Sequence, residues 1–238
     1  MARATRTPLV TALTCVRCGR RSRRGLDGPC PRCGPEGVLD VEYDLARVRR
    51  AMTRRALAAR PRTLWRYHEL LPVPEGGRRP AWEPGGTPLV ASPPLARWAG
   101  VRRRLLKDEG RNPTASFKDR ASAVGVTRAL ARRARVVACA STGNAATSLA
   151  GAAASVGLPC VIFVPEFAPE PKVAQLLIFG ARVLQVKGTY DETWELCQRA
   201  CDRHRWYNRN AAVNPSLVEG KKTCGLEIAE ESGAEVPD

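Results

Sequence analysis

The 238-residue sequence has few aromatic residues and only two histidines, and these shortages exclude several classes of protein. Aromatic side chains make up 5% of the chain, which is few for stacking on nucleic-acid bases. No apolar run approaches the roughly 20 residues needed to cross a bilayer, and residues 1–13 contain no apolar core of signal-peptide length. The composition, 44% hydrophobic and 26% charged, is that of a globular protein, and we expect it in the cytoplasm and off the membrane.

Lysine is scarce as well, although the net charge is +16. The chain has six lysines among 39 basic residues, so arginine supplies most of the positive charge. A basic surface can bind nucleic acid, and a nucleic-acid binder is therefore one hypothesis. The arginines are spread along the first two-thirds of the chain with few aromatics between them. This pattern favours compositional bias in an enzyme that handles phosphate groups.

Four of the nine cysteines form two Cys-x-x-Cys pairs near the N-terminus, each followed by a glycine. Four thiolates on two such turns match tetrahedral zinc, and the spacing between the pairs is that of a zinc ribbon. Disulfides are the competing interpretation, but they are unexpected in a chain without an export signal. A redox pair is a further alternative. We predict a structural Zn²⁺ site formed by Cys15, Cys18, Cys30 and Cys33.

One lysine lies in a context that suits chemistry. Residues 112–120 read NPTASFKDR, a polar turn that leads directly into a predicted helix over residues 119–133. A lysine amine is a useful nucleophile when it is partly desolvated and held in place, and such a turn can do both. The alternative is a surface lysine at the start of a helix. Lys118 is the candidate catalytic residue.

A second polar turn follows a short apolar run. Residues 136–140 read as a buried strand, Ser141-Thr142-Gly143-Asn144 follows, and residues 145–156 read as a helix. Hydroxyl groups, an amide and free backbone N–H groups at a helix N-terminus suit an anionic or phenolic ligand. The alternative is a simple helix cap.

The two motifs together resemble those of pyridoxal-phosphate enzymes of fold type II, in particular threonine synthases with an N-terminal zinc ribbon. The lysine motif of that family reads close to NPTGSFKDR, so that Ala115 replaces its glycine. The resemblance implies that Lys118 binds pyridoxal 5'-phosphate and that the lyase belongs to threonine biosynthesis. It also implies a set of ligand-binding residues: Phe117 and Asn144 for the cofactor, and Ser141, Thr142, Gly143, Lys107 and Asn214 for the substrate.

A third block, residues 208–223, resembles the NPxRxEGQKT segment of the same family with two departures. Leu217 stands where many threonine synthases have an arginine, and Lys221 replaces the glutamine. An arginine there would suit a phosphate group. The resemblance implies O-phosphohomoserine as substrate, with Arg209, Lys221 or Lys222 as substitutes for the missing arginine. A cysteate synthase-like enzyme and a threonine dehydratase are the alternatives.

Strand-like and helix-like segments alternate through the rest of the chain, among them a strand over residues 160–164 and a helix over residues 190–204. This alternation predicts an α/β fold with a mostly parallel sheet covered by helices. With the resemblance, the expected fold is tryptophan synthase β-like, of fold type II. The expected domains are a zinc ribbon over residues 1–40, a helical linker over 41–80 with one helix at 44–57, and a catalytic region over 81–238. Cys139, Cys160 and Cys224 read as core residues. Cys197 and Cys201 with His204 have a spacing that could ligate metal, but buried packing is favoured.

The sequence lacks a late glycine cluster. Enzymes of the resembling family hold the cofactor phosphate with a Gly-rich loop beyond the last helix expected here, residues 218–232. We therefore expect an incomplete catalytic region that, as residues 1–238 alone, binds the cofactor poorly, turns over no substrate and tends to aggregate. A homodimer is a further expectation for a full-length form.

Overall fold

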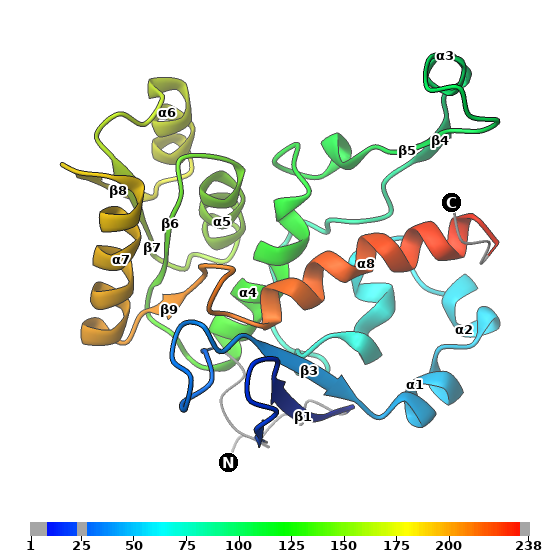
Figure 1. Ribbon diagram of the computed structural model, residues 1–238, viewed down its shortest axis with the longest axis horizontal. Coiled ribbons are helices and arrows are strands. Elements are labelled where there is room, and N and C mark those ends of the chain that lie inside the picture. The colour runs from blue at the N-terminus through cyan, green and yellow to red at the C-terminus, as the bar shows by residue number, and fades with distance from the viewer. Residues whose placement is uncertain (1–8, 23–27, 234–238) are drawn as a thin grey trace.

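The computed structural model describes residues 9–22 and 28–233 (Figure 1). The predicted tail after the last helix, residues 234–238, lies outside the described residues. The N-terminal part is a small antiparallel sheet in the order β2-β1-β3. Its strands are β1 (Val10–Cys15), β2 (Arg21–Ser22) and β3 (Leu39–Tyr43). The alternating side chains of β1 and β3 give this sheet one apolar face, on which the cysteine pairs pack.

The linker contains three short helical elements: α1 (Leu45–Ala51), α2 (Arg54–Ala58) and the 3-10 helix η1 (Leu64–Leu70). The single helix predicted over residues 44–57 is therefore wrong. Asp44 caps α1, and the Thr53 hydroxyl accepts a hydrogen bond from the Ala56 N–H at 3.1 Å, which starts a second helix. A threonine with extended backbone is a strong helix start, and it ends the first helix after two turns.

A four-stranded parallel sheet in the order β8-β7-β6-β9 forms the centre of the catalytic region. Its strands are β6 (Val137–Ala140), β7 (Cys160–Pro165), β8 (Arg182–Val186) and β9 (Tyr207–Asn208). The predicted parallel α/β arrangement is confirmed. Both faces of β6 and β7 are buried, which explains why these strands read as continuous apolar runs.

Helices cover both faces of this sheet (Figure 1). On β7, Ile162 and Val164 pack in the core shared with α5 (Asn144–Ala154) and α6 (Glu170–Ile178). The side chains between them, Val161 and Phe163, pack in the core shared with α7 (Tyr190–His204). This alternation is the two-residue period of a strand, and it assigns α7 to the opposite face from α5 and α6. Cys197 and Cys201 of α7 are buried in that core, as predicted.

Two long helices, α4 (Lys118–Ala131) and α8 (Ser216–Glu231), cross beside the sheet and pack on each other (Figure 1). A glycine allows their close approach, since a Cβ on Gly220 would lie 2.3 Å from the Arg120 carbonyl oxygen. A separate core lies where α4 meets η1 and the segment after it: Leu64, Trp65, Leu71, Val73, Ala123 and Val124. The close helix contact fixes the N-terminal turn of α4, where Lys118 lies.

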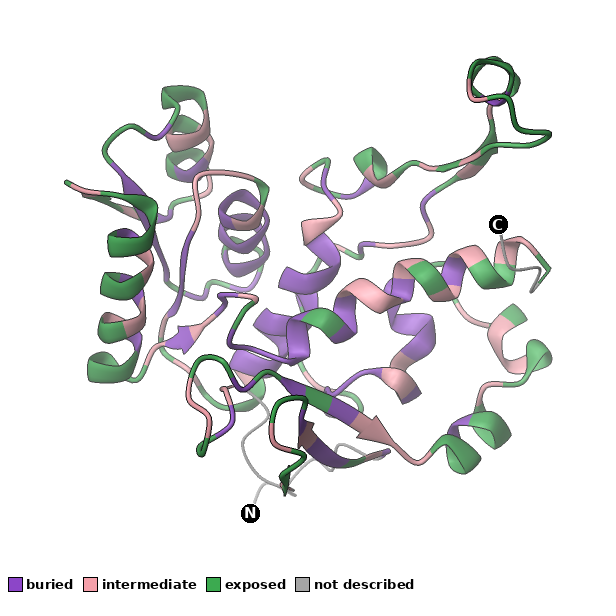
Figure 2. Cartoon of the chain, viewed as in Figure 1, coloured by how far each residue is buried: buried purple, intermediate pink, exposed green. Residues whose placement is uncertain are grey.

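An arm projects from this body (Figure 1). It consists of β4 (Leu89–Ala91), α3 (Pro93–Trp98) and β5 (Leu105–Lys107), with β4 antiparallel to β5, and the 3-10 helix η2 (Glu109–Arg111) follows. Most of the arm is exposed, as Figure 2 shows, and Trp98 has 86% of its surface in solvent. No helix among the described residues is long and apolar enough to cross a membrane.

Candidate functional site

The four cysteines of the two N-terminal pairs lie together, as predicted. Their Sγ atoms are all within 4.8 Å of one another, and those of Cys18 and Cys30 are 3.9 Å apart. Zinc–thiolate bonds of about 2.3 Å place two ligands of a tetrahedron about 3.8 Å apart, so the thiols fit one metal ion. A glycine makes room for the second turn, because a Cβ on Gly37 would lie 2.6 Å from the Cβ of Cys30. The cluster can therefore bind a metal.

The turn before α4 is held by its own polar side chains. The amide of Asn112 accepts from the Gly85 N–H at 2.9 Å and donates to the Glu109 carboxylate at 2.8 Å. The Asp119 carboxylate accepts the Thr114 N–H at 2.7 Å and also the Thr114 hydroxyl. These bonds fold residues 112–119 back on themselves and place Lys118 at the first position of the helix.

Ala115 has the left-handed backbone conformation, with φ of +53°. It lies at the centre of this turn, where its N–H donates to the Asn112 carbonyl at 2.8 Å. Glycine adopts this conformation without steric cost, which gives a physical reason for the glycine in the resembling motif. The alanine keeps the turn, but with strain.

The Lys118 side chain is half-buried, and its amine forms no ion pair or hydrogen bond within the described ranges 9–22 and 28–233. It lies over the Phe117 ring, 5.6 Å from the ring centre. Arg209 and Lys221 are two further cations in the same region. Burial, and then the positive charges of Arg209 and Lys118, lower the pKa of Lys221. An amine without a partner in positive surroundings suits a lysine-bound anionic cofactor.

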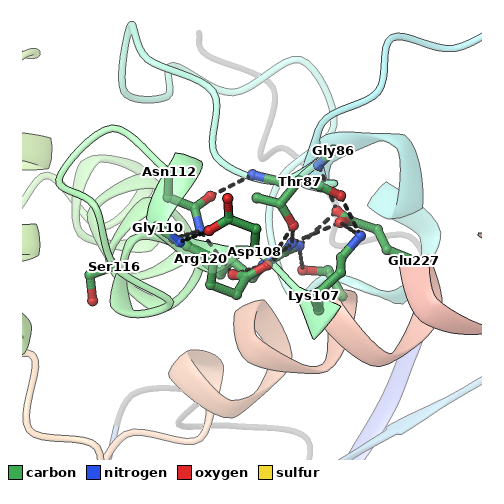
Figure 3. Close-up of polar contacts among 12 residues, drawn as sticks. Gly86, Thr87, Lys107, Asp108, Gly110, Asn112, Ser116, Arg120 and Glu227 are labelled. Carbon is green, nitrogen blue, oxygen red and sulfur yellow. Dashed lines mark hydrogen bonds and ion pairs between the residues drawn. The ribbon is translucent and has the colours of Figure 1, made fainter. Parts of the chain in front are cut away.

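A buried ion cluster is centred on Arg120, two residues after Lys118, and no sequence motif indicated it (Figure 3). The Arg120 side chain is fully buried and bonds the carboxylates of Glu109 and Glu227 in a bidentate manner, each contact at 2.7 Å. Lys107 extends the cluster through Glu227 at 3.0 Å and Glu231 at 3.2 Å. We call these five residues the Arg120 cluster.

The Arg120 guanidinium favours the ionised form of the Glu109 and Glu227 carboxylates. Burial alone would raise the pKa of Glu227, but hydrogen bonds from Arg120 and its positive charge lower the pKa below its ordinary value. Glu109 behaves in the same way. Burial raises its pKa, but hydrogen bonds from Arg120 and Thr87 outweigh this effect, so the pKa lies below its ordinary value. The charges join α4 to α8 and to the turn at residues 85–87, where the Gly86 N–H donates to Glu227 at 2.9 Å. The cluster thus positions the turn of α4 that holds Lys118.

The predicted Ser-Thr-Gly-Asn turn lies at the carboxyl end of β6. The Ser141 hydroxyl accepts from the Gly143 N–H at 3.2 Å, and α5 begins at Asn144 without a side-chain cap. The Asn144 side chain is exposed, and its amide oxygen accepts from Lys172 at 3.3 Å. Ligands of parallel sheets bind at this edge, next to helix N-termini. Thr142 lies in the same half-buried turn.

Two predicted substrate residues have their polar atoms engaged within the protein. The Lys107 amine donates to the Thr87 carbonyl at 2.6 Å as well as to the Arg120 cluster. The Asn214 amide donates to the Asn208 carbonyl at 2.9 Å and accepts from the Ser216 N–H at 3.1 Å. Their substrate roles stay predictions. Cys224 is half-buried, and so is less enclosed than Cys139 and Cys160.

The sequence profile of the family "Pyridoxal-phosphate dependent enzyme" matches residues 83–238. The chain belongs to this family. Its fold is therefore the α/β fold of type II, with a four-cysteine cluster at the N-terminal side, and the family implies pyridoxal phosphate as cofactor.

Two relatives extend the similarity to the N-terminal part of the chain. The chain is 40% identical over 229 residues to a threonine synthase of Methanosarcina acetivorans and 36% identical over 225 residues to one of Methanocaldococcus jannaschii. These matches cover 95% and 94% of the chain but 55% of each relative, so the chain spans about half the length of the curated relatives it matches.

Solved structures share the fold at lower identity. Diaminopropionate ammonia lyase of Escherichia coli in its apo form is 23% identical with a TM-score of 0.56, over 63% of this chain and 49% of its own. O-acetyl serine sulfhydrylase isoform 3 of Entamoeba histolytica is 24% identical with a TM-score of 0.58, over 64% of this chain and 49% of its own. At these identities the likeness shows the fold alone.

Proposed function

We propose that the enzyme is a pyridoxal-phosphate-dependent threonine synthase, which converts O-phosphohomoserine and water to threonine and phosphate. The observation that carries this proposal is the similarity to threonine synthases along 95% of the chain, including the region of the cysteine pairs. The partner-free Lys118 amine supports it, because the chemistry needs a lysine that can bond the cofactor and later move a proton.

The proposed roles follow from the resemblance of the two motifs to those of the family. Pyridoxal phosphate, when bound, withdraws electrons from the substrate carbons. Lys118 holds the cofactor and, once freed, exchanges a proton at the substrate α-carbon. Phe117 and Asn144 would contact the cofactor when it is bound. The uncapped N–H groups and hydroxyls of residues 141–143, at the start of α5, bind the substrate carboxylate. Phosphate leaves from the γ-carbon, and water adds at the β-carbon.

The four-cysteine cluster is proposed to hold one structural Zn²⁺. The mutual approach of the four Sγ atoms supports this, as does the small apolar core of the N-terminal sheet, in which Cys15 and Cys30 are buried. A bound metal supplies folding free energy to such a small segment. The cysteines take no part in the proposed reaction.

The test of the reaction is phosphate release from O-phosphohomoserine by a full-length form of the protein, with Lys118→Ala as the variant and Lys187→Ala as control. Lys187 is exposed at the end of β8. We expect Lys118→Ala to lose both phosphate release and the visible absorption of the lysine-bound cofactor, and Lys187→Ala to keep both. Visible absorption that survives in Lys118→Ala would contradict the role of this lysine.

Two further product assays distinguish the alternative functions from the proposed one. Ammonia release from threonine without phosphate release would identify a dehydratase, and incorporation of sulfite into an amino-acid product would identify a cysteate synthase-like enzyme. The match to an enzyme family over residues 83–238 favours catalysis over nucleic-acid binding. A protein that binds nucleic acid, and neither turns yellow nor bleaches with borohydride, would contradict the proposal.

A further inference from the structure

Arg209 carries a buried charge without an acidic partner. Only 2% of its surface is exposed, and its Nε and Nη2 both donate to one neutral oxygen, the Ser122 hydroxyl, at 3.3 and 3.2 Å. Within the described part of the chain, no carboxylate pairs with it and its Nη1 has no hydrogen-bond partner. Buried arginines are normally paired, because removing an unpaired charge from water is costly. An arginine of this kind points to an anion that is not part of the chain.

The position of Arg209 relates it to Lys118. Ser122 lies one helical turn after Lys118 on α4, so the two side chains share a face of that helix. Arg209 directly follows β9, and its backbone N–H donates to Ala138 of β6 at 2.8 Å. It therefore lies at the carboxyl edge of the sheet, on the side where the Ser-Thr-Gly-Asn turn begins.

Lys221 is the second cation of this region, and Lys222 is not. Lys221 directly follows Gly220, where a Cβ would lie 2.3 Å from the Arg120 carbonyl oxygen, so this part of α8 packs on the first turn of α4. Burial, and then the charges of Arg209 and Lys118, lower the pKa of Lys221, and in the described residues its amine has no ion pair. Lys222 instead pairs with Glu219 and lies over the Tyr43 ring, 4.1 Å from its centre. The one acid whose charge reaches Arg209 from α4 is Asp119, and its carboxylate is bonded to Thr114.

We propose that Arg209 and Lys221 form an anion subsite that receives the phosphate group of the amino-acid substrate beside Lys118. This inference rests on the proposed function. The guanidinium fork and the ammonium together match a phosphate monoester, which carries two negative charges and several acceptor oxygens. Arg209 is buried, Lys221 is half-buried, and neither has an acidic partner among the described residues.

The packing of Leu217 gives a reason why the arginine of this subsite is residue 209 and not residue 217. Leu217 is fully buried, and its side chain lies so close to α4 that a Cβ on Gly125 would be 2.8 Å from it. Gly125 is three residues after Ser122, so Leu217 and Arg209 contact neighbouring turns of the same helix. The side chain at position 217 is used for apolar packing against α4. Arg209, at the other end of the loop that joins β9 to α8, brings the positive charge to the same stretch of α4.

The experiment measures binding of inorganic phosphate by calorimetry at constant ionic strength, with chloride as the replaced anion. The proteins are the parent, Lys221→Gln, Arg209→Gln and the charge-matched control Lys187→Gln, each checked for folding by circular dichroism. We expect phosphate affinity to fall at least about tenfold in Lys221→Gln and Arg209→Gln, the loss of one charged hydrogen-bond partner, and to stay unchanged in Lys187→Gln. Lys221 is half-exposed, so its variant keeps the test decisive even where Arg209→Gln does not fold.

A second arm distinguishes the phosphate of the substrate from that of the cofactor. The parent is loaded with pyridoxal phosphate and reduced with borohydride, which fixes the cofactor covalently. Phosphate that still binds supports the substrate subsite. Phosphate excluded by the cofactor, or bound equally by all four proteins, or not bound by the folded parent, overturns it. Turnover of O-phosphohomoserine with no effect of Lys221→Gln on the KM would refute the subsite and leave the proposed reaction intact. Phosphate binding without turnover would do the reverse.

Discussion

The strained turn before Lys118 predicts that Ala115→Gly stabilises the protein. A left-handed backbone conformation costs an alanine about 1–2 kcal/mol relative to glycine, and Ala115 has φ of +53°. Glycine loses more freedom on folding, which offsets about 0.4–1 kcal/mol of this gain. The alanine methyl group is exposed, so its removal takes away little packing. The balance is a rise of about 0.5–1 kcal/mol in the free energy of unfolding.

Urea denaturation followed by circular dichroism measures this difference. With a slope of about 2 kcal/mol per molar urea, the midpoint should rise by about 0.3–0.5 M. The control is Ala174→Gly, which changes another exposed alanine, one that lies inside α6 with ordinary helical backbone. That change should lower the free energy of unfolding by about 1 kcal/mol. The reasoning is refuted when Ala115→Gly lowers the midpoint as Ala174→Gly does, because the strain would then contribute nothing.

Three further predictions concern the Arg120 cluster and the cysteines. Glu227→Ala leaves the buried cations Arg120 and Lys107 short of a partner and should lower the free energy of unfolding by about 3 kcal/mol. The control Glu83→Ala breaks an exposed pair with Arg79 and should lower it by under about 1 kcal/mol. Equal losses in the two variants would contradict the importance of burial. Because the folded pKa of Glu227 is lowered, its contribution is present above the ordinary value of about 4.5 and is lost as the pH falls through the folded value. The urea midpoint should therefore drop on going from neutral pH to about pH 3.5, and less steeply in Glu227→Gln, so parallel pH profiles would argue against the assignment. Metal analysis should find one zinc per chain, lost in Cys30→Ser, with a lower urea midpoint after chelation; iron, or no metal in freshly prepared protein, would contradict the zinc site.

The elements that the sequence predicted well have a strong local signal. The helix predicted over residues 190–204 has those bounds in the structure, because Thr189 and Glu192 form a capping box that fixes its start. The strand at residues 160–164 was equally clear, since both of its faces are buried and its apolar run is unbroken. Local sequence is enough where the stabilising contacts are local.

The features that the sequence did not reveal depend on contacts between distant segments. β9 has two residues and becomes a strand only by pairing with β6. Glu109 and Glu227 are far apart in the chain, and nothing in either segment shows that both carboxylates bond Arg120. The same holds for Arg209, whose missing acidic partner is a property of the folded surroundings. The roles of the four cysteines and of Lys118 could be predicted from the sequence because each motif is a short run of residues.

The projecting arm makes Trp98 an intrinsic optical reporter of the ion cluster. Lys107 lies at the base of the arm, at the end of β5, and its amine holds that base to α8 through Glu227 and Glu231. The indole near the tip is in solvent, whereas Trp65 is buried in the body. Acrylamide therefore quenches Trp98 in preference to Trp65, and its fluorescence anisotropy follows the freedom of the arm. As acid protonates Glu227, its hold on the base of the arm is lost, and the tryptophan signal should register this before the core unfolds.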